Sequence, residues 1–345
     1  MHPNNLPALL AATALTAGCT DRMQPTEPAV ASSAFGTITP VLACDGPHAP
    51  ATAASAGEFG APVNLGPVIN SPGFDGGPSV SPSELVLFLA SDRPGGQGNS
   101  DIWMATRTGK AHAFESPVNV GPFVNSAANE SAPEISADGL SLYFDSDRPG
   151  GFGPYDIWVA RRATLRDPFG PPENLGPQIN TTESEGHPSI STDGLELFFM
   201  SSRQGGFGDA DLWVAKRSTP HGPFGPAENL GPGLNGPGYD SEPSIANNGL
   251  TLFFASDRAG GFGLRDLWVT KKNGPHGTFG PPQNLGPVVN TQLFDVTPEI
   301  STNGSTLYFM SNRPGGVGWL DLWQTTRNSP SKGCAHADSH LSLSK

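Results

Sequence analysis

The sequence predicts an all-β protein, a five-bladed β-propeller of four-stranded antiparallel blades. The chain of 345 residues contains 44 glycines and 36 prolines, both of which interrupt helices. Its middle part repeats a 55-residue unit five times, and each unit holds short apolar segments separated by turn residues. Hydrophobic residues make up 36% of the chain, enough to build a core between short strands.

Two motifs define the repeat. SDRPGGQGNSDIW at 91–103 returns at 146–158, 201–213, 256–268 and 311–323. NLGPVIN at 64–70 returns at 119–125, 174–180, 229–235 and 284–290. Because both motifs keep the same period without an insertion, we expect every unit to have the same geometry.

The second unit illustrates the expected strands. We predict strands at 133–136, 140–144 and 156–160, and an irregular outer strand at 169–175. Asp138-Gly139 predicts the first hairpin turn, and a Gly-rich loop separates the second strand from the third. Four short strands repeated around a ring form a propeller, whereas a linear solenoid would need capping repeats, which the sequence does not show.

The order of the motifs predicts how the ring closes. The first copy opens at 59–70 with outer-strand sequence that no inner strands precede, and the last copy ends at 321–323 with a third strand. We therefore expect the N-terminal strand to complete the last blade, which removes the open sheet edge. Five copies of each motif predict five blades.

The pattern SxDGLxLYFxSDRPGGxGxxDLW resembles the TolB-type, WD-like propeller repeats of bacterial envelope proteins, over roughly residues 58–328. The resemblance implies the propeller fold and an envelope setting, since that family contains periplasmic scaffold proteins and sensors. The chain departs from the family in two respects. TolB itself has six blades, and Ser83-Glu84 replaces the Asp-Gly or Asn-Gly turn of the other units.

The two ends of the chain differ from the repeats. Residues 6–18 form an apolar run too short to span a bilayer, and residues 15–19 resemble a bacterial lipobox ending at Cys19. We predict a signal at 1–19, lipidation of Cys19 and an outer-membrane lipoprotein; an ordinary cleaved signal is the alternative. We expect a flexible tether at 20–57, a polar tail at 329–345, and a disulfide between Cys44 and Cys334.

Residues present in every unit are expected to be framework. For the arginine and aspartate sets we expect a loop-closing ion pair or Asp-to-backbone hydrogen bonds, and for the tryptophans packing between blades. The three sets are Arg93, Arg148, Arg203, Arg258 and Arg313; Asp101, Asp156, Asp211, Asp266 and Asp321; and Trp103, Trp158, Trp213, Trp268 and Trp323.

A further repeated carboxylate set is the candidate ligand-binding face. Because these acids precede the innermost strands, we expect them to ring one mouth of the central channel beside aromatic loop residues, as in a site for a sugar or a polar peptide. The alternative is that each acid neutralises the neighbouring arginine or caps a turn. Unpaired carboxylates would favour a cation such as calcium, although no EF-hand spacing occurs. The candidates are Asp75, Glu130, Glu185, Asp240, Asp295, Phe152, Phe207, Phe262 and Trp319.

A few unit-specific residues were also weighed as ligands. Glu183, Glu185 and His187 alternate along one segment and would point to one side of a strand, but they share one short loop and lack partners from elsewhere. We therefore predict no metal site. His221 and His276 are expected to be solvated loop residues on the opposite face.

The sequence predicts a non-catalytic envelope binding or scaffold protein. It contains no nucleophile elbow, HExxH motif or P-loop, and near-equivalent acids argue against the split carboxylate roles of a glycosidase. A net charge of −13 argues against nucleic acids and anionic lipids as partners. We expect a monomer without a cofactor that binds an envelope protein or glycan and touches the membrane only through a lipid anchor. A lectin-like propeller and a glycoside-active enzyme are the alternatives.

Overall fold

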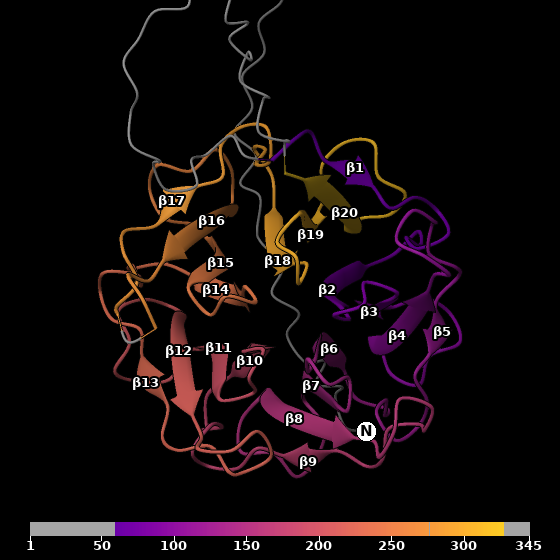
Figure 1. The fold of residues 1–345 in the computed structure, drawn as a ribbon, viewed down its shortest axis with the longest axis horizontal. Coiled ribbons are helices and arrows are strands. Elements are labelled where there is room, and N and C mark those ends of the chain that lie inside the picture. The colour runs from indigo at the N-terminus through magenta and orange to yellow at the C-terminus, as the bar shows by residue number, and fades with distance from the viewer. Residues whose placement is uncertain (1–58, 276, 328–345) are drawn as a thin grey trace, which may run out of the picture. The chain divides into compact units, whose positions relative to one another are not determined.

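The structure, a computed structural model, describes residues 59–275 and 277–327 as five four-stranded antiparallel sheets, with no helix in these ranges. The innermost strands contact one another in a closed circle: β2 with β6, β6 with β10, β10 with β14, β14 with β18, and β18 with β2 (Figure 1). This confirms the predicted five-bladed β-propeller.

Four blades run from the centre outward in chain order, and in the last blade β1 takes the outer position after β18, β19 and β20. The innermost strands are β2 (Asp75–Val80), β6 (Glu130–Ile135), β10 (Glu185–Ile190), β14 (Asp240–Ile245) and β18 (Asp295–Ile300). The second strands are β3 (Val86–Ser91), β7 (Ser141–Ser146), β11 (Glu196–Ser201), β15 (Thr251–Ser256) and β19 (Thr306–Ser311). The third strands are β4 (Asp101–Thr106), β8 (Asp156–Arg161), β12 (Asp211–Lys216), β16 (Asp266–Lys271) and β20 (Asp321–Thr326). The outer strands are β5 (Val118–Asn119), β9 (Glu173–Asn174), β13 (Glu228–Asn229), β17 (Gln283–Asn284) and β1 (Val63–Asn64).

The ring closes as predicted, with the first strand in the last blade. β1 pairs antiparallel with β20, Val63 opposite Gln324 and Asn64 opposite Trp323. In Figure 1 the indigo β1 lies beside the yellow β20. Closure therefore joins the two ends of the described chain in one sheet and leaves no blade with a missing outer strand.

The innermost and outer strands of the second blade differ most from the sequence expectation, while the second and third strands differ by at most two residues. The innermost strand of the second blade begins at Glu130, three residues earlier than expected, and includes Pro133 because the strand is bulged there. The outer strand pairs only over Glu173 and Asn174, since Pro171 and Pro172 cannot donate to the ladder.

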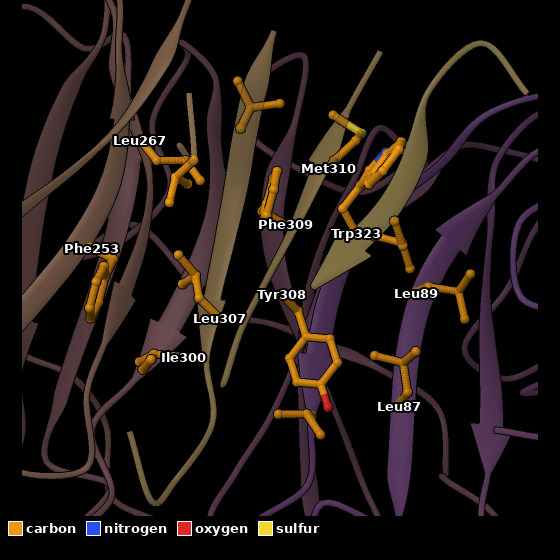
Figure 2. Packing of buried hydrophobic residues seen from close by; sticks show 14 of the residues in the cluster. Leu87, Leu89, Phe253, Leu267, Ile300, Leu307, Tyr308, Phe309, Met310 and Trp323 are labelled. Carbon is orange, nitrogen blue, oxygen red and sulfur yellow. The ribbon is translucent and has the colours of Figure 1, made fainter. Parts of the chain in front are cut away.

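The core lies between neighbouring blades, where one sheet packs on the next. Successive residues of β19 point to opposite faces of its sheet. Figure 2 shows Leu307 and Phe309 of this strand between Phe253 of the fourth blade and Leu87 of the first. Every blade repeats this arrangement, so burial of these side chains holds the ring together.

Several predictions fall outside the described residues. These are the signal at 1–19, the tether at 20–57, the tail at 329–345, and the roles given to Cys19, Cys44, Cys334 and His276. Within the part of the chain that the structure describes, no helix is long and apolar enough to cross a membrane.

Candidate functional site

The repeated carboxylates begin the innermost strands, and each is joined to the arginine of its own blade. Glu130 Oε1 lies 2.8 Å from Arg148 Nη2, and Glu185 Oε1 lies 3.3 Å from Arg203 Nη2. The same pairs form between Asp75 and Arg93, Asp240 and Arg258, and Asp295 and Arg313. All five carboxylate side chains are at most 1% exposed. They are therefore neutralised framework, which corrects the expectation that they face a ligand at the channel mouth.

The hairpin register explains this pairing. In the first blade Asp75 lies opposite Ser91, which places Arg93, two residues further on, beside the carboxylate. The arginines also bind backbone: Arg148 Nη2 donates to the Val124 carbonyl at 2.5 Å, and its Nε donates to Ser146 Oγ at 3.0 Å. Each arginine thus ties the loop after the second strand to the connection that enters its blade.

The second repeated acid caps a loop instead of pairing with arginine. Asp156 Oδ2 accepts the N–H of Phe152 at 2.7 Å, and Oδ1 accepts the N–H of Gly153 at 3.0 Å. Asn174 Nδ2 donates to the same carboxylate at 2.6 Å. Of the two expected arrangements, the Asp-to-backbone hydrogen bonds are therefore found, and the arginine–aspartate ion pair is not.

The repeated tryptophans lie mid-strand in the third strand of each blade and are buried. The framework arginines stack on them: the Arg203 guanidinium carbon lies 4.9 Å from the centroid of Trp213, and Arg148 lies 5.4 Å from that of Trp158. These contacts are cation–π interactions and fix the arginines from a second side. The tryptophans are thus covered and offer no stacking platform to a ligand.

The loops between second and third strands present exposed apolar side chains. We call the side of the propeller formed by residues 92–100, 147–155, 202–210, 257–265 and 312–320 the loop face. Phe152, Phe207 and Phe262 are 48%, 47% and 46% exposed, and Trp319 is 68% exposed. Leu264 and Val317, which the sequence analysis did not single out, are exposed there too. The loops also bond to the next connection, as Trp319 N–H donates to the Gly73 carbonyl at 3.1 Å.

Lysine side chains are unevenly distributed between the two faces of the propeller. The loop face carries exposed acids at Asp92, Asp147, Asp209, Asp257 and Glu183. Its basic side chains, among the described residues, are the five framework arginines and Arg265, and each is paired with a carboxylate. The described lysines lie at or beyond the far ends of third strands, on the opposite side, which we call the turn face: Lys110, Lys216, Lys271 and Lys272.

The central channel is lined by a bulge in every innermost strand. At the bulge one residue adopts a left-handed backbone, with φ of 43° at Ala132, 51° at His187 and 49° at Thr297. Gly77 and Glu242 occupy the equivalent positions. A β-branched residue such as threonine at positive φ is strained, and strain of this kind collects at functional sites.

Beyond the bulge, a closed belt of hydrogen bonds joins the five blades. The backbone N–H of Ile135 donates to Ser79 Oγ at 3.0 Å, Ile190 to Glu134 Oε1 at 3.1 Å, and Ile245 to Ser189 Oγ at 3.1 Å. The N–H of Ile300 then donates to Ser244 Oγ at 3.1 Å, and Val80 to Glu299 Oε1 at 3.2 Å. The belt uses serine in three blades and glutamate in two.

The two belt glutamates have perturbed acidities. Burial raises the pKa of Glu134 to about 7, against the hydrogen bonds from Ser79, Ser189 and the Ile190 N–H. Burial, and then the charge of Glu134, raise the pKa of Glu299 well above its ordinary value. Both carboxyls therefore hold protons more tightly than an exposed glutamate does.

Three hollows are candidate binding sites. A narrow throat of about 30 Å³ in the channel is lined by His187, Glu242, Thr297 and the belt glutamates. A funnel of about 200 Å³ opens from the belt toward the turn face. A larger cavity of about 810 Å³ lies on the turn face between the third and fourth blades, beside Glu196 and Lys216.

The acidic segment before the third blade does not converge on a metal. Glu185 is buried against Arg203, Glu183 is exposed, and His187 lines the throat. His221 is solvated on the turn face, 4.0 Å from Asp138. In residues 59–275 and 277–327, no group of three or more His, Cys, Asp or Glu side chains is placed to hold a metal ion.

The channel residues are hidden in the sequence because they do not belong to the pattern that all five units share. The signal was a departure from the repeat: Glu134 and Glu299 stand where the other units have Ser79, Ser189 and Ser244. Such asymmetry singles out the second and fifth blades at the channel wall.

Comparison with known proteins supports the fold and assigns no family. The chain matches no family profile and no curated protein. Among solved structures it is similar to the GH43 endo-arabinanase from Bacillus licheniformis, with 16% identity, a TM-score of 0.54, and coverage of 76% of this chain and 97% of that one. A thermostable family-43 glycoside hydrolase has 14% identity, a TM-score of 0.52, and coverage of 77% and 94%.

TolB propellers are also among the similar structures. TolB from Acinetobacter baumannii has 14% identity and a TM-score of 0.49, and the match covers 76% of this chain but only 56% of that TolB. At 14% and 16% identity, the likenesses to the two glycoside hydrolases show a shared fold and leave the activity open.

Proposed function

We propose that this protein is a non-catalytic binding or scaffold propeller of the cell envelope that docks a partner protein on its loop face. The observation that carries the proposal is the row of exposed apolar side chains, Phe152, Phe207, Phe262 and Trp319, on successive loops. Exposed aromatic side chains are frequent binding hot spots, and here they recur on neighbouring loops of one side of the propeller.

The loops are built to hold these side chains in place. Phe152, Phe207 and Phe262 each donate their backbone N–H to the capping aspartate of their own loop. A preordered loop loses little entropy on binding, so more of the contact energy appears as affinity.

Charge indicates the chemistry of the partner. The apolar side chains stand among exposed Asp147, Asp209 and Asp257, while the described lysines lie on the other face. A partner with an apolar patch rimmed by lysine or arginine would complement this surface and associate faster at low salt.

Site-specific photo-crosslinking in cells tests the proposal. Benzoylphenylalanine at Phe207 or Phe262 should give a discrete protein adduct, and Trp319→Ser should reduce its yield. Val118, 57% exposed on an outer strand, is the matched control site and should give none. Equal adducts from Val118 and Phe207, or none from any loop-face site, would contradict the proposal.

Glycan binding or hydrolysis is the second candidate, and the cavity beside Glu196 favours it. This hollow of about 810 Å³ is large enough for a small ligand and carries Asp193, Glu196 and Lys216. Within it Glu196 already pairs with Lys216 at 3.5 Å and Lys272 at 3.3 Å. Release of reducing sugar from arabinan that is lost in Glu196→Gln would support this candidate over the first.

A further inference from the structure

The belt glutamates stand where the throat and the funnel meet, because both residues line both hollows. The throat is about 30 Å³, room for one or two groups the size of a water molecule. The funnel, on the turn face, is far from the aromatic residues of the loop face and is a separate site from the one proposed above.

Aliphatic and polar side chains together form the wall of the funnel. Beyond Glu134 and Glu299, the lining residues include Val80, Pro82 and Ala137, and polar Thr192, Asn247 and Thr302. The remaining wall consists of one isoleucine from each of the other four blades, Ile135, Ile190, Ile245 and Ile300. No lysine, arginine or aromatic residue lines it. An unbranched hydrocarbon stem can pack along these four isoleucines, because apolar surface gains free energy when it is buried against apolar surface.

Neither belt carboxyl has a cationic partner in the described chain. Glu134 accepts hydrogen bonds from Ser79 Oγ at 2.9 Å and from the Ile190 N–H, and Glu299 accepts them from Ser244 Oγ at 3.0 Å and the Val80 N–H. No ion pair of either residue occurs among residues 59–275 and 277–327. A buried carboxylate of this kind gains from an added cation.

A second, independent feature points to an absent ligand. Thr297 lines the throat and is 6% exposed, and its Oγ1 has no hydrogen-bond partner among the described residues. A buried hydroxyl without a partner costs free energy, so such groups usually bind water or a ligand. The throat therefore brings together two carboxyls without a cation and a residue whose buried hydroxyl has no partner among the described residues.

We propose that this pocket binds a primary ammonium group on an unbranched aliphatic stem, with the ammonium in the throat at Glu134, Glu299 and Thr297 and the stem along the isoleucine wall. An ammonium is compact and has three donors, which matches these three acceptors. The group could come from a lysine side chain of a partner polypeptide or from a free alkylamine, and the chemistry is the same.

The other charged and titratable groups near the pocket do not compete with an ammonium group for Glu134 and Glu299. Glu242 in the throat is already bound by Arg265 at 3.2 Å, and it accepts the Thr297 N–H at 2.8 Å. His187 also lines the throat. Behind Glu299, Tyr308 is held by Arg107, with Glu84 beyond. Asp138 and Asp193 are exposed in the turns on the rim and favour a cation.

Calorimetric titration of the full chain with n-butylamine, against n-butanol as the neutral isostere, tests the proposal. Butylamine should bind at least 10-fold more tightly than butanol. The pKa of Glu134 is about 7, so this carboxyl loses its proton between pH 6 and pH 8. The affinity of the protein for butylamine should therefore rise roughly 10-fold over this range, while the amine stays protonated. Glu134→Gln should abolish this rise, whereas Glu228→Gln, on an exposed outer strand, should keep it.

The wild-type protein gives a second readout that does not depend on a variant folding. Carboxyl ¹³C NMR should show the Glu134 pKa fall when butylamine is added. Nα-acetyl-lysine methylamide binding as tightly as butylamine would identify a peptide side chain as the ligand, and binding of butylamine alone would identify a free amine. The proposal would be overturned if butanol bound as tightly as butylamine, or if butylamine left the pKa of Glu134 unchanged.

Discussion

Glu299 of the last blade accepts the backbone N–H of Val80 in the first blade at 3.2 Å. This bond crosses the seam of the ring and completes the belt around the channel. β1 seals the same seam at the outer edge by pairing with β20. The ring is therefore closed twice, once at its axis by side chains and once at its rim by the backbone.

Removing one serine of the belt should destabilise the whole propeller. Ser244→Ala leaves the buried N–H of Ile300 without its acceptor and removes the donor to Glu299. We expect a loss of about 1–3 kcal/mol in the free energy of unfolding, measured by urea denaturation. Ser83→Ala, in an exposed turn, should change it by less than about 0.5 kcal/mol. Equal effects from the two variants would show that the belt adds nothing.

The buried ion pairs should matter far more than an exposed one. Arg203→Ala leaves Glu185 buried without its cation and should cost about 3–5 kcal/mol. Arg161→Ala removes the partner of Glu173, whose side chain is 73% exposed, and should cost about 1 kcal/mol or less. Thermal unfolding of both variants checks this order. A loss of stability in Arg203→Ala that is no larger than the loss in Arg161→Ala would contradict the framework role of the buried pair.

Two glycines in one loop should respond oppositely to alanine. Gly231 has a φ of 85°, so Gly231→Ala should cost about 1–2 kcal/mol although the space around it is open. Gly233 is equally open and has no left-handed φ, so Gly233→Ala should stabilise the fold by about 0.4–1 kcal/mol. The denaturant midpoint of Gly231→Ala should lie below that of the wild type, and the midpoint of Gly233→Ala should lie above it. If both midpoints shifted in the same direction, the described backbone at these glycines would be contradicted.

The free energy of unfolding should decrease as pH rises from about 4.5 through 7, because Glu134 loses its proton in this range. The pKa of this carboxyl is about 7 in the folded protein against an ordinary value of 4.5, so the folded state binds the proton more tightly. Its stabilising contribution is complete below pH 4.5 and is lost as pH rises through 7, by roughly 3 kcal/mol. Glu134→Gln should therefore gain stability relative to wild type between pH 5 and pH 8, and Glu228→Gln should not. A constant difference between Glu134→Gln and wild type over this range would refute the assignment.

The sequence predicted the fold well because the fold is repetitive. A period that keeps Asp138-Gly139 or its equivalent at the same place defines the hairpins, and the order of motifs puts β1 beside β20. The turn at Glu84, where the other blades have glycine, still forms with a φ of 58°, so the surrounding blade overrides this local preference.

The site was harder to predict because it depends on pairing across strands. Arg148 lies eight residues from Asp156 in sequence, yet it binds Glu130, which the hairpin register brings beside it. The channel pair of Glu134 and Glu299 is 165 residues apart and meets only in the closed ring. Sequence spacing within one unit cannot show either relationship, whereas a departure from the repeat indicates where to look.

Hydrogen-exchange mass spectrometry of the full chain, with and without the cross-linked partner isolated from cells, tests the central claim of a loop-face interface most directly. Bound partner should slow exchange in the loops at 147–155, 202–210 and 257–265 and leave the turns at 191–195 and 246–250 unchanged. Protection confined to those turns, beside the cavity at Glu196, would contradict the loop-face interface and favour a ligand on the opposite side.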